Sequence, residues 1–172
     1  MIHLNIGSNL DSNFGSRFDN ISVAVNLLNE SEIKIKKISK FYETPSYPNR
    51  KFPKFLNVGV LVNFKKDYSS LLKIAHLIEN KLGRLRGRKN DPRVIDIDII
   101  DFNGLIKKED RIILPHPKSH LRNFVLYPIM EIDPNWSHPI FKKNAKYLIN
   151  KLTQKSRIEI TRLQKNVNIR YD

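Results

Sequence analysis

The chain has 172 residues, a formal net charge of +14 and no cysteine. This length suits one domain and is enough to bury a core without disulfides or a structural metal. The lack of cysteine excludes thiol catalysis, disulfides and Cys-based zinc sites. The N-terminal residues show neither a basic start nor a long apolar run, so we expect no signal peptide, no membrane span and a cytoplasmic protein.

The positive charge raises the question of nucleic-acid binding, because clustered Lys and Arg attract phosphate backbones. Much of the excess lies in residues 142–172, where Tyr147 and Tyr171 are the only aromatic residues. Single-stranded nucleic acid is normally held by aromatic side chains interleaved with the basic ones. We therefore expect small-molecule substrates, no nucleic-acid or membrane partner, and a monomer.

The first third of the chain has strand and helix patterns in alternation. Residues 2–6 resemble a short strand, and 33–42 look extended, with a bulge near Lys36. The segment 44–54 contains three prolines and should be a loop long enough to line a site. Between the first two strands, apolar residues recur at helical spacing after several candidate N-caps (Phe18, Ile21, Val25 and Leu28; Ser12, Asn13 or Ser16).

The middle of the chain continues this alternation. Residues 55–62 alternate as a central strand, and Ser69 or Ser70 should cap a helix that Gly83 ends. A strand with two aspartates follows, and Asn103–Gly104 is a hairpin turn signal, so residues 105–114 should return toward the site. Helical patterns at 124–132 and 145–152 precede a basic C-terminal segment with weak strand character.

The order strand, helix, two strands, helix, strand predicts an α+β fold with a ferredoxin-like βαββαβ core. The mainly antiparallel sheet should have its two helices on one face and Asn57, Asp96 and Asp98 on the other, with an elaboration at the C-terminus. No interdomain linker is apparent. We expect one domain over residues 1–172, with its core in 2–140 and a basic C-terminal segment in 141–172.

The segment 82–102 carries the strongest chemical signal, because a basic loop runs directly into the strand that holds Asp96 and Asp98. Carboxylates two residues apart on a strand lie roughly 7 Å apart on one face. Such a pair suits Mg²⁺, which takes one or two protein carboxylates and fills its other positions with water and phosphate oxygens. Cationic side chains of the loop could bind the remaining phosphate oxygens (Arg84, Arg86, Arg88, Lys89 and Arg93). Phosphoryl or pyrophosphoryl transfer is indicated.

A strand with one solvated face next to a solvated basic loop would produce the same pattern. Phe55 and Phe124 could likewise be ordinary core residues. Asn57 is more informative, because an Asn inside an otherwise apolar strand needs partners for its amide, either a ligand or a buried polar network.

Several motifs occur together and in order: Ile6–Leu10 (IGSNL), Phe41–Pro45 (FYETP), Phe55–Asn57 (FLN), Leu82–Arg84 (LGR), Pro92–Asp98 (PRVIDID), Pro115–Pro117 (PHP) and Arg122–Leu126 (RNFVL). With them the chain resembles the 6-hydroxymethyl-7,8-dihydropterin pyrophosphokinase family over about residues 2–140. The resemblance implies Mg²⁺-dependent transfer of pyrophosphate from ATP to the pterin alcohol in tetrahydrofolate biosynthesis, with AMP as the second product. It also implies that Asp96 and Asp98 hold two Mg²⁺ ions.

The resemblance further assigns residues to each substrate. Arg86, Lys89 and Arg93 would act with the two aspartates in catalysis. ATP would be bound by seven residues (Glu79, Arg86, Lys89, Arg93, Arg111, His116 and Arg122), and the pterin by six (Thr44, Pro45, Tyr47, Phe55, Asn57 and Phe124). The alcohol could lose its proton to Asp96 or to solvent.

The basic loop departs from the family's pattern. Asn90 and Asp91 stand where a Trp and a Gly are usual before Pro-Arg, and the loop is one residue shorter. Loop closure over the pterin could therefore differ. A non-catalytic pterin- or nucleotide-binding protein on the same fold is the alternative, although retention of Asp96, Asp98 and Arg93 speaks against it.

Overall fold

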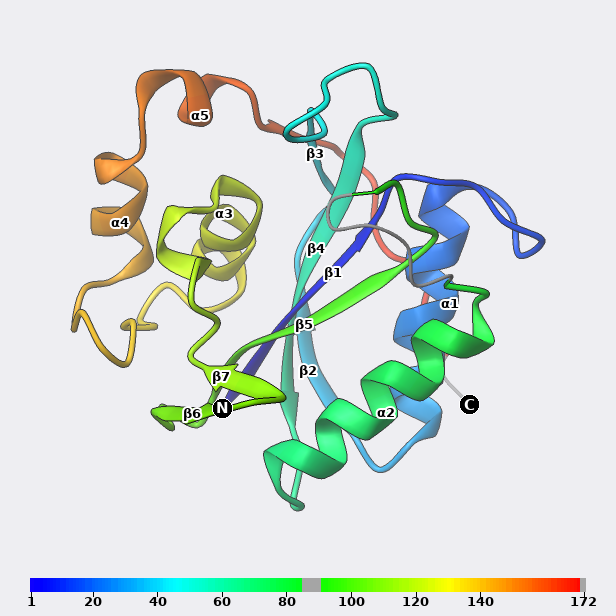
Figure 1. Ribbon diagram of the computed structural model, residues 1–172, viewed down its shortest axis with the longest axis horizontal. Helices are drawn as coiled ribbons and strands as arrows, with labels where there is room; N and C mark the ends of the chain where they lie inside the picture. Colours follow the sequence, from blue (N-terminus) through cyan, green and yellow to red (C-terminus); the bar gives the residue numbers. More distant parts are fainter. Residues whose placement is uncertain (85–90, 171–172) are drawn as a thin grey trace.

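A computed structural model describes residues 1–84 and 91–170 of the chain. Figure 1 shows a twisted sheet between two groups of helices, α1 and α2 on one side and α3 and α4 on the other. The strands are β1 (Ile2–Ser8), β2 (Lys34–Ile38), β3 (Tyr42–Thr44), β4 (Phe55–Asn63), β5 (Asp96–Phe102), β6 (Lys107–Glu109), β7 (Ile112–Leu114) and β8 (Thr161–Arg162). The helices are α1 (Arg17–Glu30), α2 (Tyr68–Lys81), the 3₁₀ turn η1 (Ser119–Leu121), α3 (Asn123–Ile132), α4 (Ala145–Lys151) and α5 (Gln154–Ile158).

The main sheet has the strand order β5-β1-β4-β3-β8, with β2 also paired to β4, and its pairings are antiparallel. This arrangement confirms the predicted α+β fold and its ferredoxin-like core, in which the second strand is divided into β2 and β3. The division follows a register shift between Ile35 and Lys37, where a bulge was expected.

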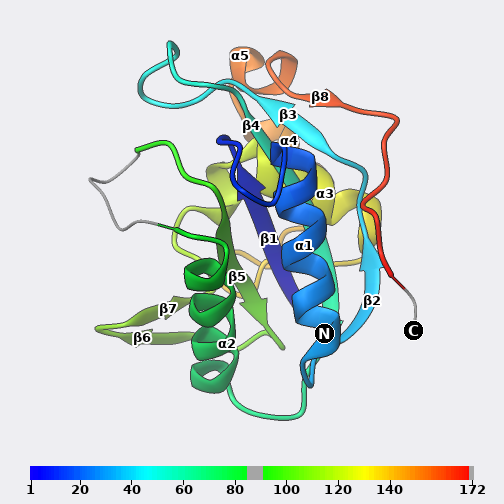
Figure 2. The ribbon, with the colours of Figure 1, turned by 90° about the vertical axis from the view of Figure 1, so that its right-hand side faces the viewer.

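Helices α1 and α2 cover one face of the sheet, as Figure 2 shows with both in front of the strands. Ile95, Ile97 and Ile99 are buried on this side together with alternate residues of β1 and β4. Ser16, one of the three candidate caps, starts α1 in a capping box with Asp19. Gly83 follows α2 at a φ of +83°, which agrees with its expected left-handed conformation.

Helix α3 packs on the opposite face, where Gly59 of β4 provides the space. A Cβ at Gly59 would lie 2.8 Å from the Cβ of Pro128 in α3. A register shift in the pairing of β1 with β5 turns both Ile100 and Asp101 toward this side. Ile100 is fully buried in a second apolar cluster with residues of α3 and α4, and Trp136 Nε1 donates to Asp101 Oδ2 at 2.8 Å.

One local prediction was wrong. Helix α2 is capped by Asp67, whose side chain accepts from Ser70 N–H at 2.7 Å, instead of by Ser69 or Ser70. Asn103 and Gly104 do form a turn with positive φ, and the chain after it returns toward the site as expected, since residues 110–113 line the same cavity as Asp96 and Asp98. Residues 107–114 form a separate hairpin, β6–β7, because the chain pairs with itself around Asp110.

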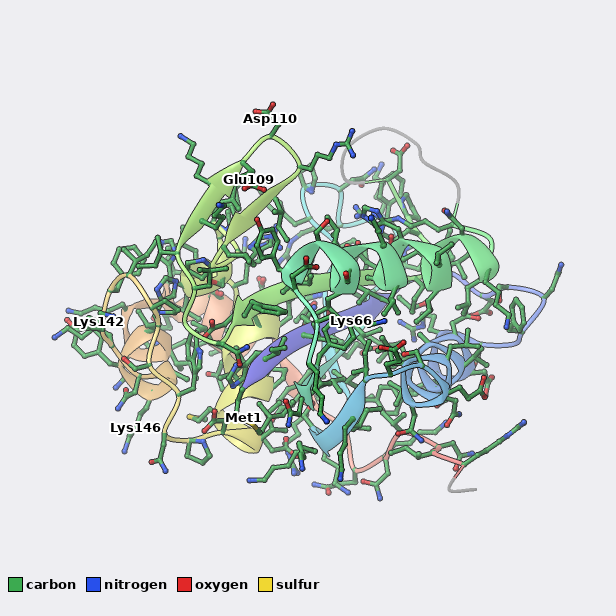
Figure 3. The ribbon with its side chains drawn as sticks, turned by 90° about the horizontal axis from the view of Figure 1, so that it is seen from below. Met1, Lys66, Glu109, Asp110, Lys142 and Lys146 are labelled. Atoms are coloured by element: carbon green, nitrogen blue, oxygen red, sulfur yellow. The ribbon has the colours of Figure 1, made fainter. Side chains whose placement is uncertain are left out.

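The C-terminal segment runs along the edge of the sheet. Its β8 pairs with β3, and Val167 is buried in the same core as α1. Figure 3 shows Asp110 at the tip of the β6–β7 hairpin, with Lys142 and Lys146 on the side of α4. Within residues 1–84 and 91–170 no helix combines the length and the apolar character needed to cross a membrane.

Candidate active site

Two aspartates lie on the sheet face opposite α1 and α2. In the register of the sheet, Asp96 is opposite Gly7 and Asp98 is opposite Asn5, while on the other side of β1 Gly7 is opposite Asn57. Directly opposed residues share a face. Asn57, Asp96 and Asp98 therefore lie on one face, as the alternation of their strands predicted.

Arginines surround the two carboxylates. Arg84 Nη1 lies 2.9 Å from Asp96 Oδ1, and Arg93 Nη1 lies 3.0 Å from Asp96 Oδ2. Arg122 Nη1 lies 3.5 Å from Asp98 Oδ2. Each carboxylate is thus partly neutralised by cations that come from outside β5.

The electrostatics of Asp98 differ from those of an ordinary surface carboxyl. Burial first, and then the neighbouring charge of Asp96, raise the pKa of Asp98 to about 7, while Arg122 and Arg84 oppose the rise. Two carboxylates this close repel each other in their charged forms. A bound cation would relieve that repulsion.

Glu79 of α2 lies beneath the aspartate strand. It is buried, its Oε1 accepts from Ile97 N–H at 2.8 Å, and it is ion-paired with Arg84. Burial raises the pKa of Glu79, while the Ile97 bond and Arg84 oppose the rise. Glu79 therefore orients Arg84 toward Asp96 and fastens α2 to β5.

The carboxylates line a cavity of about 370 Å³ between α2, β5 and the β6–β7 hairpin. Its lining includes six of the charged or titratable residues of the site (Glu79, Arg84, Asp96, Asp98, Arg111 and His116). Burial and the charge of Arg122 lower the pKa of His116 to about 4, so its imidazole is neutral near pH 7. Its Nδ1 lies 3.2 Å from Lys118 N–H, and its Nε2 lies 3.3 Å from Arg122 Nη1, which is a donor only.

Asn57 forms a polar patch with Asn5 on the same sheet face. Asn5 Nδ2 donates to Asn57 Oδ1 at 3.1 Å, and both residues are buried. Gly7 lies directly under this amide, because a Cβ there would be 2.8 Å from Asn57 Oδ1. The absence of a Cβ at Gly7 therefore makes room for the Asn57 side chain.

The loop ends near this patch are held by Asn9. Its Oδ1 accepts from Arg93 N–H at 2.7 Å, and its Nδ2 donates to Ser46 Oγ at 3.3 Å and to the Pro53 carbonyl at 3.1 Å. One buried amide thus joins the segment before β5 to the proline-rich loop 44–54. This link sets the position of that loop relative to Arg93.

The structure brings together most of the residues that the sequence singled out. Glu79, Arg93, Asp96, Asp98, Arg111, His116 and Arg122 surround or pair across the cavity. Thr44 pairs with Phe55 at the neighbouring strand ends, Tyr47 is highly exposed on its loop, and Arg122 stacks over the Phe124 ring at 5.4 Å. Arg86, Lys89 and Asn90 lie outside the described residues.

Sequence reasoning missed two features of the site. Arg84 was grouped with the phosphate-binding cations, but its bridge between Glu79 and Asp96 was not anticipated. Asn5 was overlooked, although it stands between Leu4 and Ile6 in a buried strand, the same signal that singled out Asn57.

The donor set fits a hard divalent cation. Within the part of the chain that the structure describes, no group of three or more His, Cys, Asp or Glu residues could hold a metal. Asp96 and Asp98 instead offer two carboxylates on one face, beside a cavity that Arg84 and Arg111 also line. This arrangement suits Mg²⁺, which is bound through one or two carboxylates together with substrate phosphates.

Residues 3–134 match the family described as 7,8-dihydro-6-hydroxymethylpterin-pyrophosphokinase (HPPK). A folic acid synthesis protein of Dictyostelium discoideum is 40% identical over 139 residues, which are 81% of this chain and 20% of that protein. The 2-amino-4-hydroxy-6-hydroxymethyldihydropteridine pyrophosphokinase of Aquifex aeolicus is 33% identical over 145 residues, 84% of this chain and 88% of that enzyme.

Solved structures show the same fold. A Plasmodium falciparum HPPK-DHPS structure superposes with a TM-score of 0.70 at 16% identity, covering 94% of this chain and 46% of that one. The chain thus spans about a fifth of the length of its Dictyostelium relative and less than half of the Plasmodium chain.

Proposed function

Since the chain belongs to the 7,8-dihydro-6-hydroxymethylpterin-pyrophosphokinase family, we propose that it transfers pyrophosphate from ATP to 6-hydroxymethyl-7,8-dihydropterin, with AMP as the second product. This step belongs to folate synthesis, and the name of the Dictyostelium relative refers to the same process. We further propose that the protein is cytoplasmic, because both substrates are small water-soluble molecules, and that it is a monomer.

One observation carries the proposal: Asp96 and Asp98 share a face at the edge of a cavity, and three arginines surround the two carboxylates. Arg84 and Arg93 contact Asp96, and Arg122 approaches Asp98. A triphosphate that enters this cavity offers these arginines new anionic partners. The arginines would then exchange a carboxylate for phosphate oxygens, which they can bind in bidentate fashion.

The freed carboxylates are the groups that would hold two Mg²⁺ ions. When bound, Mg²⁺ supplies charge neutralisation on the transferred phosphates and a template for in-line attack. Arg93 and Arg122 would orient the phosphates, and the neutral imidazole of His116 would lie beside Arg122 at the same phosphates. By resemblance to the family, Arg86 and Lys89 would also bind the phosphates. Arg111 and Glu79 would, by the same resemblance, contact the nucleotide.

The pterin would bind on the same sheet face, across β1 from the two aspartates. Asn57 can both donate to and accept from the amide edge of a pterin ring. Phe55 and Phe124 offer flat apolar surfaces for stacking, and Thr44, Pro45 and Tyr47 belong to the loop that Asn9 ties down. Positioning of two substrates on one rigid sheet is a major source of rate acceleration.

Phosphorus-31 NMR of ATP, 6-hydroxymethyl-7,8-dihydropterin and Mg²⁺ with the protein tests this function. We expect AMP and a pterin diphosphate, and no turnover when Mg²⁺ is chelated. Formation of ADP would mean simple phosphoryl transfer and would contradict the proposed attack at the β-phosphorus. Unchanged ATP despite pterin binding would favour a non-catalytic binding protein.

Substitution of Asp96 tests the metal assignment. In Asp96→Asn we expect turnover to fall on the order of 100- to 1000-fold, because one anionic metal ligand is lost from the transition state. Pterin affinity should largely remain. Asp133→Asn is the matched control: Asp133 also pairs with a basic side chain, His3, but outside the cavity, and its activity should stay within about twofold. Normal turnover of Asp96→Asn would refute the metal site.

A further inference from the structure

The amide pair of Asn5 and Asn57 has unused hydrogen-bonding capacity in the interior of the protein. Among the described residues, Asn5 Oδ1 and Asn57 Nδ2 are buried and have no hydrogen-bond partner. Asn5 is 5% exposed and Asn57 is 3% exposed. A buried polar atom without a partner costs about 1–3 kcal/mol, so a pair of them on a ligand-facing sheet surface indicates that a ligand completes their bonding.

The two unused atoms have opposite character. Asn57 Nδ2 is a donor and Asn5 Oδ1 is an acceptor, and the bond from Asn5 Nδ2 to Asn57 Oδ1 holds the two amides together as one unit. Asn57 Oδ1 keeps a second lone pair. The pair therefore presents, in order, one donor and two acceptor positions to a molecule that lies against it.

A pterin ring carries the complementary sequence of groups along one edge: the C4 carbonyl, the N3–H and the 2-amino group. Asn57 alone can serve the carbonyl and the N3–H. The remaining donor on that edge is the 2-amino group, and the remaining acceptor on the protein is Asn5 Oδ1. In the sheet, Asn5 also lies opposite Asp98, so a ring held by the pair would lie beside the phosphate site.

We propose that Asn5 is a further pterin-binding residue, which accepts a hydrogen bond from the 2-amino group and fixes the orientation of the Asn57 amide. This inference rests on the proposed function and adds a specificity-determining contact to it. Its consequence is that the protein distinguishes pterins from otherwise identical rings without the 2-amino group.

Calorimetric titrations of the full chain, with Mg²⁺ and a non-hydrolysable ATP analogue present, test the proposal. The ligands are 6-hydroxymethylpterin and its 2-desamino counterpart. We expect the wild-type protein to bind the 2-desamino ring about 10- to 100-fold more weakly, because Asn5 Oδ1 stays unpaired in that complex. In Asn5→Ala both ligands should bind within about twofold of each other, and affinity for the ATP analogue should be unchanged.

Two further variants separate recognition from folding. Asn5→Leu keeps the branching of the side chain at Cγ without polar atoms and should give the same loss of discrimination if Asn5→Ala is unstable. Asn20→Ala removes another buried amide, whose Nδ2 donates to the Leu10 carbonyl in the α1 region, and should keep full discrimination.

Persistent discrimination in the Asn5 variants, none in the wild type, or an equal loss of pterin and nucleotide affinity would overturn the assignment of Asn5. Failure of the wild-type protein to bind any pterin would instead refute the proposed function, so the two failures are distinguishable.

Discussion

The buried His138 shows how a single residue can make the stability of this protein depend on pH. His138 is buried, its Nδ1 accepts from Ile140 N–H at 3.2 Å, and its Nε2 lies 3.2 Å from Ser119 Oγ. Burial, followed by the nearby His120, lowers the pKa of His138 to about 4. The folded protein therefore keeps a neutral imidazole at a pH where the unfolded chain would already be protonated.

We predict that His138 makes the protein less stable in mild acid. Between its unfolded pKa near 6.5 and its folded pKa of about 4, the unfolded state binds a proton that the folded state does not. The free energy of unfolding should then decrease as pH falls through this window. Urea denaturation at pH 7.5 and pH 5 measures the decrease, and His138→Gln should reduce it. An unchanged pH dependence in His138→Gln would contradict the prediction.

At the scale of elements, the sheet face that carries the site depends on how closely α3 approaches β4. Gly59 permits this approach: a Cβ there would lie 2.8 Å from Pro128 Cβ and 3.2 Å from Ile132 Cδ1. Ile100, turned to the same side at the irregularity of β5, fills the neighbouring space with Val125 and Leu126. Helix α3 and the end of β5 together cover the sheet face beyond Asn5 and Asn57.

Gly59→Ala should therefore push α3 away from the sheet. We expect a loss of about 1–3 kcal/mol in the free energy of unfolding, because added volume in a packed interface forces backbone shifts. Gly104→Ala is a useful comparison: no atom lies within 4 Å of its Cβ position, so only its positive φ should cost stability. Chemical denaturation measures both, and wild-type stability of Gly59→Ala would disprove the close packing.

At the scale of the whole molecule, the C-terminal segment joins parts of the chain that are far apart in sequence. Arg162 contacts Glu131 at 3.0 Å, and Glu131 also accepts from the Tyr42 hydroxyl at 2.7 Å. Leu163 N–H donates to the Phe41 carbonyl at 2.8 Å, and Asn26 Nδ2 donates to the Asn168 carbonyl at 3.0 Å. The segment thus links α3, β3 and α1.

Deletion of residues 160–172 should destabilise the whole protein. Loss of the buried Val167 alone should cost about 2 kcal/mol, and each kcal/mol should lower the melting temperature by about 2–4 °C in a domain of this size. Calorimetry of the full chain should show a single transition. A deletion variant that melts like the full chain would mean that the segment is an independent appendage instead of part of one domain.

Much of the fold could be predicted from sequence because its signals are local. One short segment is enough to show the alternation of β4 or β5 and the apolar spacing of α1. The end of α2 at Gly83 is likewise a local signal. The same holds for the aspartate pair, since two residues on one strand share a face whatever the partner strand. Family motifs then connected these residues to a pterin and ATP.

Contacts between distant segments were decided only by tertiary structure. The register of β1 with its two neighbouring strands places Asn5 in contact with Asn57 and opposite Asp98. No local sequence pattern predicts either of these pairings. Arg84 forms ion pairs with both Glu79 and Asp96 because α2 packs against β5. Such partners depend on the summed packing of many elements, so the sequence by itself determined which groups the site contains, and the fold determined which of them meet.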